Sequence, residues 1–203
     1  MEFMDVIRKR RSVRRFKPDP IPEDVLEQIL EAGRIAPSGM HLQNWYFGLI
    51  TNDDLKRRMI DIAGGQDWIA TAPVVLAICA ILVGDLKDAA EDDKNLLGNR
   101  FRYGEGLIDY LNACPDRKAM RVFSDCNDVL IAGQQMLLAA ENFGLRGCWI
   151  AYLDIARAGD LLELPDDIAC TFLLPIGYPD EEPEPIERKR RDEVVFHNTW
   201  RSR

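Results

Sequence analysis

The sequence predicts an α+β fold in which short strands alternate with helices, and three observations support this class. Several segments repeat apolar residues with the 3.6-residue period of a helix that is buried on one face. Shorter runs between them are rich in β-branched and aromatic residues, which is the composition of strands. One of these runs, residues 73–82, is apolar on both faces, and it therefore belongs in the middle of a sheet that is covered on both sides.

Two helices are predicted at the start of the chain. Residues 4–10 form the first, which is short. The second begins at Pro22, where Glu23 and Asp24 suit the first turn of a helix because acidic groups are favoured there. Its apolar side chains share one face and predict packing against a core, and they are Val25, Leu26, Ile29 and Leu30.

A strand, a helix and the central strand follow. Residues 45–51 are β-branched and aromatic and predict a strand, and the polar residues 52–54 then open a helix that ends near Ala63. After the central strand, residues 84–120 are polar, charged and interrupted by glycines. This segment predicts a helical excursion or lid.

The longest helix is predicted over residues 125–143. Ser124 is a suitable N-cap, and Gly144 is placed to end the helix in the left-handed conformation. Apolar residues occur nearly all the way round this helix. Such a pattern indicates burial either in a core or in a subunit interface.

The last elements are a short extended piece at residues 147–150, a helix over 154–164 and a strand over 170–176. The tail, residues 180–203, is too polar to fold alone and contains the basic run 188–191 as well as an apolar end. We expect this tail to wrap another surface, such as a partner subunit.

Length and composition describe one globular domain over residues 1–203. No linker divides the 203 residues, and no apolar run approaches the roughly 20 residues that a membrane helix needs, so a cytoplasmic protein is expected. The five cysteines show no C-x-x-C spacing, and there are only two histidines. Neither a disulfide framework nor a metal site is predicted.

The charge distribution points to a bound anion. Seven of the ten residues from Arg8 to Lys17 are cationic, which gives residues 1–17 a charge of +5 in a chain of −8 and leaves −13 for the other 186 residues. A protein this acidic would repel a nucleic-acid backbone over most of its surface, so a small phosphate fits better. A solvated helix end remains the alternative.

A second candidate is the segment 36–45, which lies between a predicted helix and a predicted strand. Pro37 would stop the helix and Ser38 with Gly39 would turn the chain, which is a purely structural interpretation. The functional interpretation is that Ser38, Gly39, His41 and Gln43 place small polar groups beside a planar ligand. Composition alone leaves both open.

The sequence gives little support for catalysis by protein side chains. Two histidines make a nucleophilic triad hard to build, and the sequence contains no G-x-S-x-G motif. The dinucleotide and P-loop glycine motifs are also absent from the sequence. No catalytic side chain is therefore predicted.

Four blocks occur in a specific order: residues 10–16, 36–45, 144–150, and 177–179 followed by the basic pair 188–189. No single block is specific, but the ordered set resembles the FMN-dependent nitroreductase family over essentially the whole chain. The resemblance implies a homodimer with a central, mostly antiparallel sheet flanked by helices. It also implies two FMN molecules, each lying between the subunits, and a tail that wraps the partner subunit.

The resemblance also implies roles for individual residues. Arg10 and Ser12, with Arg188 and Lys189, would hold the FMN phosphate, and Arg11 belongs to the same cofactor-binding block. Arginine suits this task because its guanidinium meets phosphate oxygens in a bidentate way.

The remaining candidates would contact the flavin ring. Arg14 matches the family's basic residue near N1 and O2, where a positive charge tunes the redox potential. Pro37, Ser38 and Gly39 would come from the other subunit and line the ring, and His41 is a further cofactor-binding candidate in the same segment. Ile150 and Ala151 would approach the ring from the loop after Gly147, and Gln66 would reach its pyrimidine edge.

Four positions depart from the family pattern. His41 stands where the family has Asn, Asn44 where it has Pro, and Arg190-Arg191 where it has Pro-Leu. These departures concern the contact made at position 41 and leave the expected fold unchanged.

The activity implied is a ping-pong reaction in which NADH or NADPH reduces the flavin and leaves, and a nitroaromatic compound, a quinone or a similar electrophile then takes its place. Cys148 lies near the expected site and is predicted to be a small core residue. The alternatives are a specialised flavoprotein of the same fold, such as a reductive dehalogenase or a flavin-fragmenting enzyme, a flavin-binding protein without turnover, and a nucleic-acid-binding protein.

Overall fold

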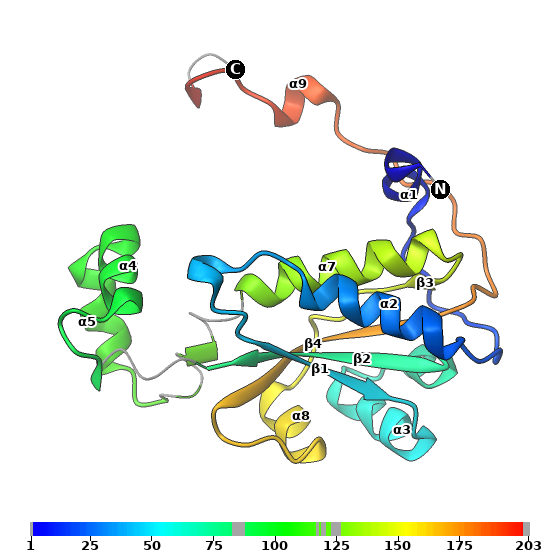
Figure 1. Cartoon of the computed structure of the whole chain (residues 1–203), viewed down its shortest axis with the longest axis horizontal. Helices are drawn as coiled ribbons and strands as arrows, with labels where there is room; N and C mark the ends of the chain where they lie inside the picture. The colour runs from blue at the N-terminus through cyan, green and yellow to red at the C-terminus, as the bar shows by residue number, and fades with distance from the viewer. Residues whose placement is uncertain (1, 83–87, 117, 119–120, 123–126, 201–203) are drawn as a thin grey trace.

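The structure is a computed structural model, and it describes residues 2–82, 88–116, 118, 121–122 and 127–200 (Figure 1). Its centre is a four-stranded sheet in the order β1-β2-β4-β3, with every pair of neighbours antiparallel. The strands are β1 (Trp45–Ile50), β2 (Val74–Ile81), β3 (Arg146–Gly147) and β4 (Ile168–Gly177). The predicted α+β class with a mostly antiparallel sheet is confirmed.

Strand β2 lies inside the sheet, as its sequence predicts. It pairs with β1 on one side and with β4 on the other, and Leu76 stands opposite Leu49 and Leu174 in the two pairings. Seven of its eight residues are buried. An unbroken apolar run is what a strand needs when both of its faces pack against helices.

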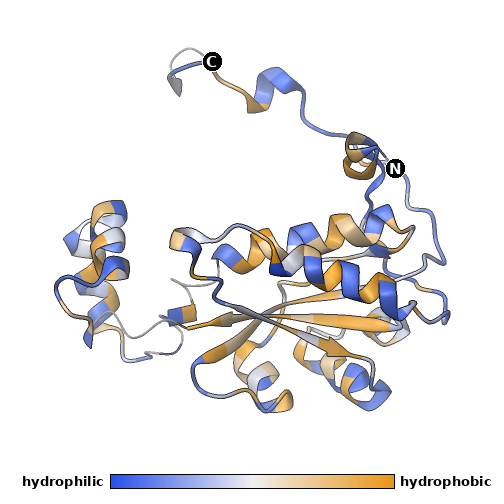
Figure 2. Cartoon of the chain, in the orientation of Figure 1, coloured by the Kyte–Doolittle hydropathy of each residue, from blue (hydrophilic) through white to orange (hydrophobic). Residues whose placement is uncertain are grey.

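Helices cover both faces of the sheet (Figure 1). Helices α2 (Glu23–Arg34) and α7 (Asn127–Asn142) pack together over one face, whereas α3 (Asp53–Ile62), α8 (Ile155–Leu161) and the 3-10 turn η2 (Asp67–Thr71) lie on the other. The buried side chains form one large cluster under each layer, and Figure 2 shows the apolar surfaces turned inward. Each helix is therefore anchored by an apolar stripe on the sheet side.

Local polar groups set where two of these helices begin. The Asn52 Oδ1 accepts a hydrogen bond from the Leu55 amide at 3.0 Å, and the Asp154 Oδ1 accepts one from the Arg157 amide at 3.1 Å. Each bond satisfies an amide that the helix itself cannot satisfy. The predicted starts of α3 and α8 are confirmed.

Helix α7 buries one side and exposes the other. Val129, Ala132 and Met136 are fully buried, but Leu130 and Ile131 are 39% and 43% exposed. The inner face meets the core, and an apolar outer face remains uncovered in this chain. The predicted N-cap, Ser124, lies outside the described residues.

Among the residues that the structure describes, four helices lie away from the sheet: α1 (Phe3–Lys9), α4 (Lys94–Tyr103), α5 (Glu105–Ala113) and α9 (Arg191–Val194). Helices α4 and α5 come from the predicted excursion and enclose a small apolar cluster of their own, formed by Leu96, Ile108 and Leu111. The tail is exposed along most of its length and carries α9 away from the body (Figure 1). Within the described ranges, no helix has the length and apolarity needed to cross a membrane.

Candidate functional site

The segment that follows α1 is held against the edge strand β3. Ser12 forms a parallel bridge with Gly147, and the Val13 amide donates to the Gly147 carbonyl at 3.3 Å. Val13 is completely buried, whereas Arg14 next to it is exposed. Because the buried Val13 is followed by the exposed Arg14, the basic side chain points outward while the backbone is held against β3.

This contact requires a glycine at position 147. A Cβ there would lie 2.8 Å from the Pro175 carbonyl oxygen and 3.0 Å from the side chains of Ile176 and Leu137. Any larger residue would push β3 away from β4. The conformation of the basic segment thus depends on the close approach of these two strands.

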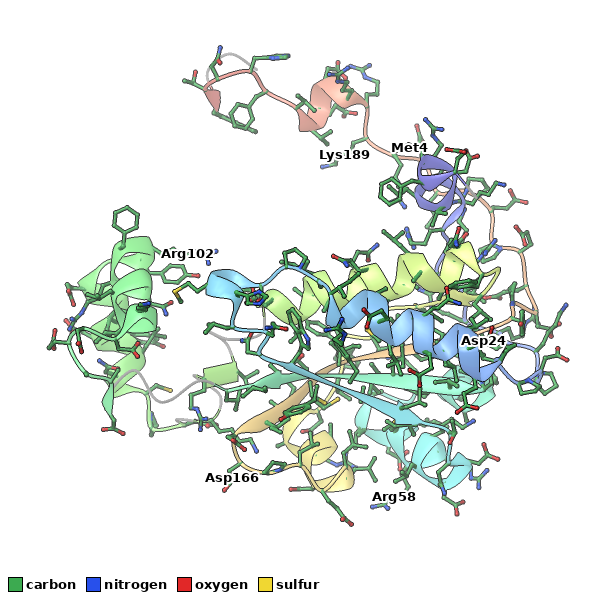
Figure 3. The ribbon with its side chains drawn as sticks, viewed as in Figure 1. Met4, Asp24, Arg58, Arg102, Asp166 and Lys189 are labelled. Carbon is green, nitrogen blue, oxygen red and sulfur yellow. The ribbon has the colours of Figure 1, made fainter. Side chains whose placement is uncertain are left out.

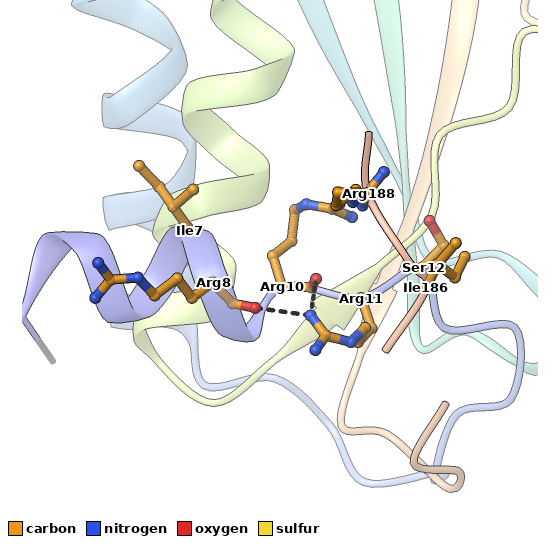
Figure 4. A pocket seen from close by; sticks show the side chains of 7 residues that line it. All are labelled: Ile7, Arg8, Arg10, Arg11, Ser12, Ile186 and Arg188. Carbon is orange, nitrogen blue, oxygen red and sulfur yellow. Dashed lines mark hydrogen bonds between the residues drawn. The ribbon is translucent and has the colours of Figure 1, made fainter. Parts of the chain in front are cut away.

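A cavity of about 330 Å³ opens between this basic segment and the tail (Figure 4). Four of the predicted cofactor residues, Arg10, Arg11, Ser12 and Arg188, line it. Its other lining residues are Ile7, Arg8 and Ile186. Residues about 175 positions apart in the sequence therefore meet at one site.

The guanidinium groups of the cavity point in different directions. Figure 4 shows Arg10 and Arg188 directed toward each other, while Arg11 turns back toward the helix end. The Arg11 Nη1 donates to the carbonyls of Arg8 at 2.7 Å and Arg10 at 2.9 Å. Arg10 and Arg188 make no hydrogen bond to a backbone carbonyl among the described contacts, so their N–H groups can bind an anion.

Lys189 lies just outside this cavity. It is exposed on the tail, in the stretch between α1 and α9, as Figure 3 shows. The structure therefore brings together three of the four residues predicted to hold a phosphate, and Arg11 with them. Lys189 is near the group in the chain but is not part of the lining.

Arg14 lines a second cavity, of about 420 Å³, on the other side of Ser12. The acidic start of the tail closes this cavity: the Arg14 amide donates to the Glu181 Oε1 at 2.6 Å, and Glu182 and Pro183 contribute to the wall. In the sequence, Glu181 and Glu182 are an adjacent acidic pair at a turn, a pattern that usually indicates solvated surface, so a place in the site was not predicted for them.

Gln66 and the residues around Ile150 come from neighbouring loops. Gly64 has a φ of +69°, and a Cβ on it would lie 2.2 Å from the ring of Tyr152, so the two loops are in direct contact. The Gln66 Nε2 donates to the Ala63 carbonyl at 2.8 Å. Ile150 faces the core and exchanges backbone hydrogen bonds with Leu173, which leaves the exposed Ala151 as the outward residue of that loop.

The segment 36–44 has an unusual backbone. It contains the 3-10 turn η1 (Gly39–His41), and Met40, His41 and Gln43 all have positive φ angles, between 48° and 60°. Such angles are uncommon for residues other than glycine. They place the exposed His41 Nε2 at 3.1 Å from the Gln43 Nε2.

Two polar groups hold this loop in place. The Gly39 amide donates to the Asp128 Oδ2 at 3.0 Å, and the Gln43 amide donates to the Ser38 hydroxyl at 2.9 Å. Pro37, Gly39 and His41 are exposed. Asp128, in the first turn of α7, was not identified from the sequence, because nothing local marks its contact with a residue 89 positions earlier.

The loop and the basic cavity lie at opposite ends of α7. Asp128 holds the loop at the first turn of this helix, and β3 follows its last turn. The helix has 16 residues, and 1.5 Å per residue gives a length of about 24 Å. One chain therefore does not bring Pro37, Ser38, Gly39 and His41 to the cavity that holds Arg10.

Cys148 is buried next to the basic segment. Burial raises the pKa of its thiol, although Arg14 and Arg10 lie close enough to oppose that effect. The thiol therefore stays protonated at neutral pH, and the predicted role as a small core residue is confirmed. Within the described part of the chain, no group of three His, Cys, Asp or Glu side chains could hold a metal ion.

Comparison with known proteins gives a consistent result. A family model described as "Nitroreductase family" matches residues 7–178. A Thermus thermophilus protein named NADH dehydrogenase is 33% identical over 198 residues, which cover 95% of this chain and 93% of the relative.

Two further proteins are similar over nearly the whole chain. The solved structure of the NADPH:FMN oxidoreductase from Vibrio harveyi, complexed with NAD+, matches with a TM-score of 0.74 at 26% identity, covering 98% of this chain and 77% of the other. Mouse iodotyrosine deiodinase 1 is 28% identical, covering 96% of this chain and 68% of the relative.

Proposed function

This chain belongs to the nitroreductase family, and on that premise we propose that it is an FMN-dependent oxidoreductase that uses NADH or NADPH as its reductant. Its substrates would be nitroaromatic compounds, quinones or similar electrophiles. NAD(P)H would bind first, be oxidised and leave before the electrophile binds. When bound, FMN supplies the redox chemistry of these two steps, because it accepts a hydride from NAD(P)H and passes two electrons to the electrophile.

The observation that carries the proposal is the cavity lined by Arg10, Arg11, Ser12 and Arg188. A phosphate monoester is a dianion with several acceptor oxygens, and guanidinium groups with a hydroxyl are matching donors. The rest of the chain is acidic, so this cluster of basic side chains is a place that attracts an anion. The residues present therefore fit the phosphate of FMN.

Arg14 would act on the ring rather than on the phosphate. It is exposed in the adjacent cavity, and its backbone amide is fixed by Glu181. A fixed cation near the pyrimidine edge favours the added negative charge of a reduced ring. Arg14 would thereby raise the reduction potential without exchanging a proton itself.

We also propose that the active form is a homodimer whose two chains share each site. In a single chain the loop at Pro37–His41 lies at one end of α7 and the basic cavity near the other, and the helix between them is about 24 Å long, so the loop that lines a given flavin would come from the partner subunit. The exposed Leu130 and Ile131 on the outer face of α7 support an interface there. The tail, residues 180–203, would wrap the partner, and residues 84–120 would form a lid on a single domain that spans residues 1–203.

The experiment compares two double variants. Arg10→Ala with Arg188→Ala removes two charge-assisted contacts, each worth about 1.5–3 kcal/mol, and should give colourless protein with an FMN Kd raised at least a hundredfold. Arg58→Ala with Arg157→Ala removes the same charge from the α3–α8 face, which Figure 3 shows far from Lys189, and should stay yellow.

The activity test is anaerobic. Wild-type protein loaded with FMN should bleach on addition of NADH or NADPH and regain its absorbance when a quinone is added. Full FMN retention by the Arg10/Arg188 variant would refute the phosphate site, and failure of both nicotinamides to bleach the protein would refute the reductase activity.

A second candidate is a reductive dehalogenase. The similarity to mouse iodotyrosine deiodinase 1 over 96% of this chain favours it. Reoxidation of the reduced protein by an iodinated phenol, with release of iodide and no response to quinones, would select this activity over the first.

A further inference from the structure

Glu141 is the only acidic residue that is buried among the residues the structure describes. It lies near the end of α7 with no exposed surface, in a helix whose other buried residues are apolar or glycine. Neither carboxylate oxygen receives a hydrogen bond of good geometry from the described protein groups. A buried carboxylate in this state is costly unless nearby charges compensate it.

The compensating charges belong to the basic site. The Arg146 Nη1 lies 3.0 Å from the Glu141 Oε1, as an ion pair, while the same nitrogen donates to the Leu145 carbonyl at 3.1 Å. Arg10 and Arg11 also act on this carboxylate, and Glu182 is the one acid that opposes them. Arg146 begins β3, its neighbour Gly147 bridges Ser12 of the cavity lining, and α1 packs against α7, so Glu141 lies close to the cavity that Arg10 and Arg11 line.

We propose that Glu141 is the internal counter-anion of Arg10 and Arg11, that it competes with the cofactor phosphate for their charge, and that it takes up a proton when the phosphate binds. This inference rests on the proposed function, because it needs the FMN phosphate to occupy the cavity. It makes Glu141 a positioning residue for the site, since it touches neither the flavin nor the substrate.

The direction of the effect follows from the charges. Burial raises the pKa of Glu141, while Arg146, Arg10 and Arg11 favour its ionised form. A phosphate dianion in the cavity draws on the same two arginines and adds negative charge, so the pKa of Glu141 rises further. By linkage, the affinity for FMN should fall as the pH increases through this pKa.

The phosphate of FMN has the opposite pH dependence. Its second pKa is about 6, so raising the pH converts it to the dianion that arginines prefer. Comparing wild type with Glu141→Gln separates the two effects, because the variant keeps the shape of the side chain and the titration of the phosphate but loses the titration of residue 141.

The test measures the Kd of FMN and of riboflavin from pH 5.5 to pH 8.5. At pH 8, Glu141→Gln should bind FMN about threefold to tenfold more tightly than wild type, since a coupling of one pKa unit equals a factor of ten, and the ratio should shrink as the pH falls. Riboflavin lacks the phosphate, so its Kd should be the same in both proteins. Glu31→Gln removes the same charge from an exposed residue and should behave as wild type.

A second measurement does not depend on the variant. Calorimetry of FMN binding to wild type over the same pH range, in two buffers of different ionisation enthalpy, should show proton uptake in addition to the proton exchange of the phosphate itself. A variant that binds FMN equally or more weakly at pH 8, or wild type that takes up no proton beyond that exchange, would overturn the inference while leaving the proposed function standing. Wild type that binds no FMN would overturn both.

Discussion

The two ends of helix α7 hold the two halves of the proposed cofactor site by different means. At the end that adjoins β3, long charged side chains meet: Arg10 and Arg188 face a cavity, and Glu141 lies close to it with Arg146. At the other end, Asp128 holds a backbone amide of a tightly turned loop. The end that adjoins β3 can therefore bind a charged group, whereas the loop at the other end offers a surface of defined shape.

This difference predicts how each end responds to substitution. The charged end depends on residue type, because only a guanidinium offers several donors in a fixed plane. The loop depends on backbone conformation, because three of its residues have positive φ angles. Variants that separate affinity for the phosphate from affinity for the ring will therefore test the comparison.

The largest effect is expected in a complementation experiment. Chains that carry Arg10→Ala with Arg188→Ala lack the phosphate end, and chains that carry Gly39→Trp would block the loop end. A Cβ at the exposed Gly39 would lie 3.5 Å from the Asp128 carboxylate, which is ordinary van der Waals contact, so we expect its own chain to tolerate the substitution. Each homodimer should bind no FMN, whereas the heterodimer should bind about half the normal amount.

Differently tagged chains allow the heterodimer to be purified and its flavin counted by absorbance. Heterodimers of two Gly39→Trp chains with different tags serve as the control and should remain empty. Absence of flavin from the mixed heterodimer would mean that the two ends do not serve one site across the interface.

A smaller effect should distinguish the two ends by ligand. Arg10→Ala should raise the Kd of FMN about tenfold or more and leave that of riboflavin unchanged, because the lost contact is to the phosphate. Asp128→Ala should raise both values by the same factor, about fivefold, since a hydrogen bond worth about 1 kcal/mol to the loop is lost. Fluorescence titration measures both, and equal ratios in the two variants would contradict the division.

Gly147→Val should disturb the charged end through the backbone. Its side chain would meet the Pro175 carbonyl, and overpacking of this kind costs about 1–3 kcal/mol of the free energy of unfolding. Urea denaturation measures this loss. Gly159→Ala in α8 has no atom within 4 Å of the new Cβ and should be neutral or slightly stabilising.

The smallest effect concerns thiol reactivity. Burial raises the pKa of Cys148, so at pH 8 its thiolate fraction is lower than that of an ordinary cysteine, and iodoacetamide should modify it slowly. Cys114, on the excursion, is partly exposed and should react first. Mass spectrometry follows both sites. Equally fast labelling at pH 8 would show that the charged end is open to solvent.

Much of the fold could be predicted because its signals are local. The apolar run at β2 and the caps at Asn52 and Asp154 depend on neighbouring residues, and each appears where the sequence indicates. The resemblance also predicts that Arg10 and Arg188 belong to one site. Both residues line the same cavity, and their role in binding a phosphate remains a prediction.

The contacts that shape the site depend on residues distant in the chain. Asp128 and Gly39 are 89 residues apart, and Arg14 and Glu181 are 167 apart. Glu141 is a buried acid in a helix whose other buried residues are apolar or glycine, and only the packed structure shows that it pairs with Arg146 and feels the charges of Arg10 and Arg11. Periodicity reports which face of a helix is buried, but not what lies opposite a particular position.

The length of α7, which is 16 residues, determines how far apart the groups at its two ends lie. In a dimer that shares its sites, this helix sets the spacing between the loop given to one flavin and the arginines given to the other. Inserting one residue would advance one end by about 1.5 Å and rotate it by about 100°, so that Asp128 or Glu141 would face the wrong direction. The length of α7 is thereby fixed, whereas α4 and α5, which pack mainly on each other, are free to change in length.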